Sequence, residues 1–272
     1  MRIAATWCWL AIGAAPVLAQ PTPVLRPPPT PEWTLELTND FTSPGGSDVN
    51  QNETQARLTG HVNPRSTLFF EVDQHNRFSD LDSALLVGGG HAFGTKHLLL
   101  VSASIAFGFN APTLIPKREY TVQGDVRATP HVSPVFEFQR SEYEGTTRVN
   151  QLTVGLKVTP ISKVMVQPAY INTTSVLAPN VTEVGHAFGL TASAPMTSKL
   201  ALTFRGGYGH EHAMARRRTI VEVVRSLQQL SLGPGIAWQI TPSRDLKLTY
   251  IYEAKKTKYA QHGFIADFSV GF

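Results

Sequence analysis

The end of the chain alternates between apolar and polar residues. Between residues 264 and 272 every second side chain is apolar, and only Ile265 interrupts the polar register. The apolar positions are Phe264, Ala266, Phe268, Val270 and Phe272. Successive side chains of a β-strand point to opposite faces, so this period of two residues predicts a strand with one apolar and one polar face.

Short turns divide the rest of the chain. Most contain proline, which presets a turn dihedral and cannot donate to a central ladder, so each turn marks a strand boundary. The segment after each turn is rich in alternating or densely spaced apolar residues, as at the start of a strand. We place the turns at residues 63–64, 94–96, 129–130, 159–160, 194–195 and 241–242.

The second set of connections is longer and polar. It lies at residues 43–52, 75–82, 110–117, 141–147, 173–180 and 210–219, with a short connection at 256–259. Alternating short and long connections are typical of up-and-down barrels with strands of about ten residues. Six turns join seven hairpins, which predicts an all-β, transmembrane, antiparallel up-and-down β-barrel of about fourteen strands. The stretch 212–229 fits a long strand or a short helix, so the number becomes twelve or sixteen if it or the first strand is misread.

The apolar faces of the predicted strands favour a lipid environment. Leu200, Leu202, Phe204 and Tyr208, for example, share one side of a strand. In water such faces would promote aggregation, whereas in lipid they are in their preferred solvent. A soluble lipid-binding barrel or sandwich is the alternative, and its interior would be apolar. We therefore predict a barrel in the bacterial outer membrane, in contact with outer-membrane lipids and lipopolysaccharide.

The two ends of the chain support export and assembly. Residues 1–19 read as a secretory signal peptide with cleavage after Ala19, so Cys8 would be removed. Residues 20–31 predict a proline-rich periplasmic linker, and residues 32–272 the barrel. A terminal strand that ends on an aromatic residue resembles the closing strand of outer-membrane barrels, which the barrel assembly machinery reads. The expected assembly signal is Phe264, Phe268, Val270 and Phe272.

Charge places the candidate chemistry in the interior. The formal net charge is +4 with scattered basic residues, a pattern that does not indicate a nucleic-acid partner. Charges of both signs in the inward register predict either a polar passage for a hydrophilic solute or a salt-bridged plug, and argue against strong ion selectivity. The candidates facing the lumen are Glu36, Asp40, Arg57, Glu71, Asp73, Glu119, Asp125, Arg127, Glu137, Lys157, Arg205, Lys247, Glu253 and Asp267.

Motifs for catalysis and metal binding are weak. There is no GxSxG or HExxH pattern, and the pair His131 and Ser133 lies at a turn at the predicted periplasmic end. His210 and His212 give two imidazoles without a third ligand. The repeated GHAFG, at 90–94 and 185–189, predicts two histidines at corresponding points of two strands. We expect no metal, no cofactor and no enzymatic activity.

Several features resemble the YaiO family of outer-membrane β-barrels. They are the opening WTLEL at residues 33–37, Arg77-Phe78 followed by acidic residues, the proline-containing stretch LIPKREY at 114–120, and the aromatic C-terminus. The resemblance covers residues 33–272. It implies a role connected with exopolysaccharide synthesis and export, although the linker stands where many members carry tetratricopeptide repeats, and it carries over no catalytic residues.

The expected function is a passage or an anchoring component for a hydrophilic molecule, with a polysaccharide as one candidate. Two alternatives remain open. One is an enzyme that modifies lipid A or phospholipid, which would need a catalytic set near the outer rim; the other is a purely structural barrel. Arg216 to Arg218 offer a basic cluster for lipopolysaccharide phosphates.

Overall fold

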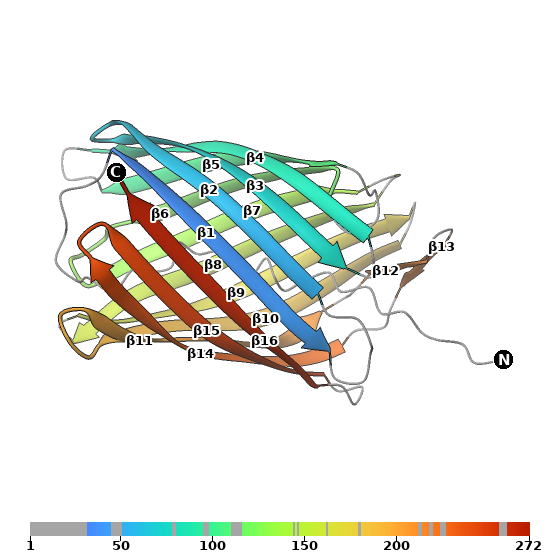
Figure 1. Cartoon of the computed structure of the whole chain (residues 1–272). Helices are drawn as coiled ribbons and strands as arrows, with labels where there is room; N and C mark the ends of the chain where they lie inside the picture. The colour runs from blue at the N-terminus through green and yellow to red at the C-terminus, as the bar shows by residue number, and fades with distance from the viewer. Residues whose placement is uncertain are drawn as a thin grey trace.

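The chain forms one closed barrel of fourteen antiparallel strands (Figure 1). The computed structural model describes residues 32–44, 51–77, 80–94, 98–109, 116–143, 145, 147–161, 163–178, 181–211, 214–217, 220–223, 227–255 and 260–272. The predicted signal peptide and linker lie outside these residues. Within them no helix is long and apolar enough to cross a membrane. The predicted fold class and the number of fourteen strands are confirmed.

The barrel strands follow one another around the wall in chain order. They are β1 (Trp33–Pro44), β2 (Gln51–Asn63), β3 (Ser66–Arg77), β4 (Asp80–Phe93), β5 (Leu99–Phe109), β6 (Arg118–Val126), β7 (Val132–Glu142), β8 (Arg148–Ile161), β9 (Val164–Ala178), β10 (Val181–Pro195), β11 (Leu200–Glu211), β14 (Leu227–Thr241), β15 (Arg244–Lys255) and β16 (Ala260–Gly271).

The first and last strands close the barrel. β1 pairs antiparallel with β16, with Thr34 opposite Gly271 and Phe41 opposite Phe264. Beyond this register the Trp33 N–H donates to the Phe272 carbonyl at 3.0 Å. Figure 1 shows β1 in blue beside β16 in dark red, with the C-terminus where β1 begins. The C-terminal strand therefore has a partner on both sides, because β15 pairs with its other edge.

The two rims of the barrel differ. The turn end carries the connections β2–β3, β4–β5, β6–β7, β8–β9, β10–β11 and β14–β15, and the loop end carries the other seven. At three turns a side-chain oxygen accepts a backbone N–H two residues ahead: Asn63 from Arg65 at 2.8 Å, Thr129 from His131 at 3.2 Å and Thr197 from Lys199 at 3.1 Å. Such local bonds favour a tight reversal of the chain.

Several predicted connections are wrong in extent, because the strands continue into them. β3 runs to Arg77 and β9 to Ala178, so most of the predicted connections 75–82 and 173–180 is paired strand. Threonine fits the pleated surface of a strand well, and these segments are rich in polar residues that sequence patterns assign to loops. Residues 159–160 and Pro195 likewise lie inside β8 and β10, near strand ends, where a missing N–H is tolerated.

The ambiguous stretch 212–229 contains neither a helix in its described part nor a single long strand. A small hairpin of β12 (Met214–Arg217) and β13 (Ile220–Val223) forms a separate two-stranded sheet, and β14 begins only at Leu227. Because this hairpin pairs with itself, it leaves the barrel at fourteen strands.

Burial is reversed relative to a water-soluble protein. Large apolar side chains on the outer register are exposed, with Val154 50% and Phe188 63% accessible. The polar side chains Glu137 and Gln167, on the other register, are only 2% and 1% accessible. Ile265, the exception in the sequence pattern, faces inward and is buried. An apolar outside around a polar inside matches a barrel in lipid.

Candidate functional site

A row of charged residues crosses the inner face of β1 to β3. Glu36 lies opposite Arg57, and Arg57 lies opposite Glu71. The Arg57 Nη1 is 3.5 Å from Glu71 Oε2, and its guanidinium carbon lies 4.0 Å above the centre of the Phe69 ring. The aromatic face and the carboxylate together fix the direction of this guanidinium.

A second inner row is acidic and lies nearer the loop end. Asp40 is opposite Glu53, Glu53 is opposite His75, and His75 is opposite Asp82. The His75 Nδ1 is 3.1 Å from Glu53 Oε2. Asp73 lies on the same face of β3, two residues before His75, and interacts electrostatically with Glu53, Glu71 and His75. Carboxylates therefore dominate the inner face of β1 to β4 at the loop end.

Polar bonds continue along β6 to β8. Ser141 Oγ donates to Glu119 Oε2 at 2.9 Å, and the Gln123 amide donates to Glu137. Lys157 Nζ reaches across β7 to Asp125 Oδ2 at 2.7 Å. Most of the charged groups on this part of the wall are thus held by neighbours.

Arg127 lies apart from these pairs. It directly follows β6 at the turn end, where its backbone N–H donates to the Leu98 carbonyl at 2.8 Å. Its side chain is exposed at this rim.

A mixed cluster lies on β1, β11, β15 and β16. Lys247 Nζ is 3.7 Å from Asp267 Oδ2, whose other oxygen accepts the Thr38 hydroxyl at 2.8 Å. Arg205 interacts electrostatically with Asp40, Asp267 and Glu253. These inward residues come from distant parts of the sequence, and the closure of the barrel brings them together.

The inner wall beside Arg205 is built from small residues. The inner register of β10, β11 and β14 carries Gly185, Gly189, Gly207, Gly209, Gly233 and Gly235. A Cβ at Gly233 would lie 2.6 Å from Arg205 Cγ, so the arginine side chain packs directly on that glycine. A Cβ at Gly189 would meet nothing nearer than Ile171 at 4.0 Å. Much of this wall carries no bulky inward side chain.

Sequence reasoning missed four inward carboxylates, and they change the charge balance. Glu53, Asp82 and Glu183 lie beside or inside segments assigned to connections, and Asp245 stands at the start of a strand, just after the predicted turn 241–242. Among the described side chains of the inner register, the carboxylates are Glu36, Asp40, Glu53, Glu71, Asp73, Asp82, Glu119, Asp125, Glu137, Glu183, Asp245, Glu253 and Asp267, and the cations are Arg57, Lys157, Arg205 and Lys247. These four cations lie at the middle or in the turn-end half of their strands, so the loop-end half is acidic.

Histidines on the outer face form hydrogen bonds with hydroxyl groups. Tyr170 and Tyr250 hydroxyls lie 2.6 Å and 2.5 Å from the Nδ1 atoms of His186 and His262. His91 Nδ1 is 2.9 Å from Ser66 Oγ, near the turn end. His91 and His186 therefore do not occupy corresponding points, although both face outward, because the first is near the end of its strand and the second is in its first half.

Nucleophile and metal sites find no further support in the described residues. Ser66 and His91 form a serine–histidine pair that sequence reasoning missed, but no carboxylate is bonded to His91 among the described contacts. His131 lies at the turn before β7, and Ser133 is opposite Lys157 on the inner face. No group of three potential metal ligands occurs in the part of the chain that was searched. His212 and the side chain of His210 lie outside the described residues.

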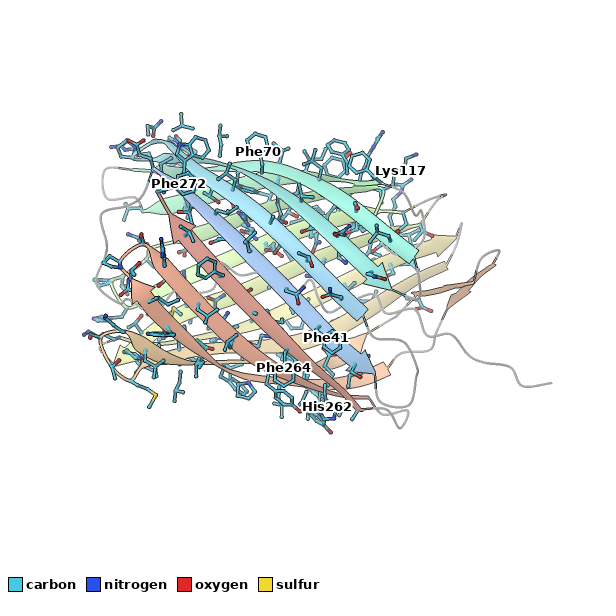
Figure 2. The ribbon with its side chains drawn as sticks, viewed as in Figure 1. Phe41, Phe70, Lys117, His262, Phe264 and Phe272 are labelled. Atoms are coloured by element: carbon cyan, nitrogen blue, oxygen red, sulfur yellow. The ribbon has the colours of Figure 1, made fainter. Side chains whose placement is uncertain are left out.

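The expected assembly residues share the outer register of β16. Phe264 is opposite Phe41 and Tyr250, and Phe268 is opposite Leu37 and Leu246. Figure 2 shows Phe41 and Phe264 side by side near the loop end and Phe272 at the other rim. Val270 also faces outward, and the Phe272 side chain is exposed. Phe264 and Phe272 are exposed, whereas Phe268 and Val270 between them are partly covered.

Replacing Phe272 by serine should lower the amount of folded barrel in the outer membrane several-fold. The substitution removes an exposed aromatic ring but keeps the backbone bond of residue 272 to the Trp33 carbonyl, which is 2.9 Å long. Membrane fractionation with immunoblotting measures the effect. Phe109→Ser, at the exposed loop-end terminus of β5, is the matched control and should assemble normally. Equal levels of both variants would contradict a special role for the C-terminal aromatic.

Comparison with known proteins supports the fold. No family model and no curated protein matches the sequence. Solved structures do match in fold. A bacterial polysaccharide outer membrane secretin gives a TM-score of 0.61 at 10% identity, covering 88% of this chain and 98% of that one. The toluene transporter TbuX of Ralstonia pickettii gives 0.58 at 12% identity, with 92% and 94% covered.

The prediction that the chain is not an enzyme needs correction. OmpT, an outer membrane protein of Vibrio cholerae, also shares the fold, with a TM-score of 0.51 at 8% identity over 87% of this chain and 96% of that one. A barrel shared at such low identity by proteins of different kinds does not separate enzymes from transporters. The expectation of no enzymatic activity is therefore withdrawn. The comparisons establish that the chain has the fold of bacterial outer-membrane β-barrels.

Proposed function

We propose that the chain resides in the bacterial outer membrane and that its interior provides a passage for a hydrophilic solute. The observation that carries this proposal is the polar inner wall of a closed barrel whose outer face is apolar. Hydroxyl, amide and charged groups along such a wall replace the hydration of a polar solute as it moves. The transporter and the secretin among the similar folds support this reading.

Three ion pairs occupy other parts of the inner wall than the glycine-rich side formed by β10, β11 and β14. Arg57, Lys157 and Lys247 are tied to carboxylates on their own part of the wall. The glycines of β10, β11 and β14 face the same interior without side chains. We place the path of the solute along this glycine-rich side, where many of the inward positions carry no side chain.

Orientation and partners follow from this location. The loop end faces outside, and the turn end, with both ends of the barrel domain, faces the periplasm, as in other barrels with tight periplasmic turns. The barrel assembly machinery would engage β16, and outer-membrane lipids would cover the apolar face. A polysaccharide is a candidate solute or an anchored partner, in keeping with the resemblance to the YaiO family.

Liposome swelling tests the passage. Vesicles that contain the folded barrel should swell when placed in iso-osmotic solutions of small sugars, and the rate should fall as the solute becomes larger. Vesicles with heat-unfolded protein are the control. If the folded barrel leaves the rate unchanged, the passage proposal fails, and binding of polymer without swelling would favour the anchoring role instead.

The excess of inward carboxylates predicts a preference for cations. An acidic wall concentrates cations and excludes anions from a confined path. In a potassium chloride gradient the reversal potential should therefore indicate higher permeability for potassium than for chloride. Neutralising the acidic row with Asp40→Asn, Glu53→Gln and Asp82→Asn should move the ratio toward one. The control, Asp125→Asn with Lys157→Gln, removes an ion pair without changing the net charge and should leave the ratio unchanged.

A further inference from the structure

Most of the charged residues described on the outer face lie close together at the loop end. Among the side chains that the structure describes, those of the outer register that belong to Asp, Glu, Lys or Arg are Arg118, Arg140, Glu142, Arg148 and Arg244. Arg244 begins β15 at the turn end. The other four lie together on β6, β7 and β8 at the loop end, where they form what we call the arginine row.

The geometry of the arginine row comes from strand pairing. Arg118 is opposite Glu142, and Glu142 is opposite Arg148. Arg140, two residues before Glu142, donates to its Oε1 from Nε at 3.0 Å and from Nη2 at 2.8 Å. Arg118 and Arg148 are exposed, and neither forms an ion pair with a residue that the structure describes. Lys117, labelled at the loop end in Figure 2, directly precedes the row.

Three successive layers of outward side chains across β6, β7 and β8 indicate the depth of the arginine row in the membrane. Val122, Phe138 and Leu152 form an exposed apolar layer across β6, β7 and β8. The next layer toward the loop end is Tyr120, Arg140 and Asn150, and the next is Arg118, Glu142 and Arg148. The change from an apolar layer, through a mixed layer with one tyrosine, to a charged layer marks the border between hydrocarbon and headgroups.

We propose that the arginine row binds the phosphate group of a phosphorylated glycolipid in the outer leaflet. Three guanidiniums against one carboxylate leave a local excess of two positive charges, which matches the charge of a phosphate monoester. Planar guanidiniums bind phosphate oxygens with paired N–H donors, and Glu142 holds one of them in place. The apolar layer below accepts the acyl chains of the same molecule. The site differs from Arg216 to Arg218, whose side chains lie outside the described residues.

The proposal rests on the outer-membrane location but not on the passage, so the two can fail independently. Native mass spectrometry of the folded barrel in detergent measures binding of bisphosphorylated lipid A, of dephosphorylated lipid A and of inorganic phosphate. Bisphosphorylated lipid A should bind, and Arg118→Gln or Arg148→Gln should weaken its binding about tenfold. Heat modifiability on gels confirms that each variant is folded.

The controls separate recognition from general attraction. Arg244→Gln removes the same charge from the outer face at the turn end and should bind the lipid like the wild type. Arg148→Lys should retain part of the affinity, because lysine keeps the charge but not the paired donors. Equal binding of dephosphorylated lipid A, or equal loss in Arg244→Gln, would overturn the phosphate site. Displacement of the lipid by equimolar inorganic phosphate would overturn its assignment to a lipid.

Discussion

Replacing Arg205 by glutamine should lower the free energy of unfolding of the barrel by about 3 kcal/mol. The guanidinium interacts electrostatically with Asp40, Asp267 and Glu253 across the strands around β16, in a cluster that also contains Lys247. Without it Lys247 is left to balance Asp40, Asp267 and Glu253, so the repulsion among these carboxylates increases, and the smaller glutamine leaves part of the Gly233 surface uncovered. Urea unfolding in phospholipid vesicles, followed by tryptophan fluorescence, measures the change.

A second substitution distinguishes charge from packing at this position. Adding Asp40→Asn to Arg205→Gln removes one of the uncompensated carboxylates and should recover part of the lost stability. Arg244→Gln, on the outer face at the turn end, should have little effect. An Arg205→Gln variant as stable as the wild type would show that the inner cluster is fully solvated and contributes little.

Replacing Val154 by arginine should destabilise the barrel by about 2–4 kcal/mol in lipid. Val154 faces outward from the middle of β8, between Phe136 and Tyr170, and is half exposed. A guanidinium there would have to lie in hydrocarbon or bend toward a distant rim. The same vesicle unfolding measurement gives the loss.

Gln151→Arg is the matched control on the same strand. Gln151 lies on the inner register, opposite Gln139 and Thr173. The added charge enters the polar interior, close to its acidic half, and should change stability much less than Val154→Arg. Similar losses for both variants would contradict the assignment of the outer face to lipid.

The strand number was predictable because the turns carry strong local signals. Asn63, Thr129 and Thr197 each bond to the backbone two residues ahead, and prolines stand beside all three turns. The ends of the strands toward the loops carry no such signal. Pairing of polar segments such as 173–178 with a neighbouring strand depends on tertiary contacts, so sequence patterns placed these residues in loops.

The same limit explains which site residues were missed. Asp82 was assigned to a connection, so the inner row from Asp40 to Asp82 could not be assembled from the sequence. The arginine row depends on Glu142, which was also assigned to a connection. Its neighbours Arg118 and Arg148 are far apart in sequence, and only strand register places them on either side of Glu142.

Single-channel recording across a planar bilayer is the most direct test of the proposed passage. The folded, heat-modifiable barrel should produce discrete conductance steps, and the same sample should produce none after heat unfolding. If folded barrels insert into the bilayer but give no steps, the interior is closed, and the salt-bridged plug is the correct description of the inner wall.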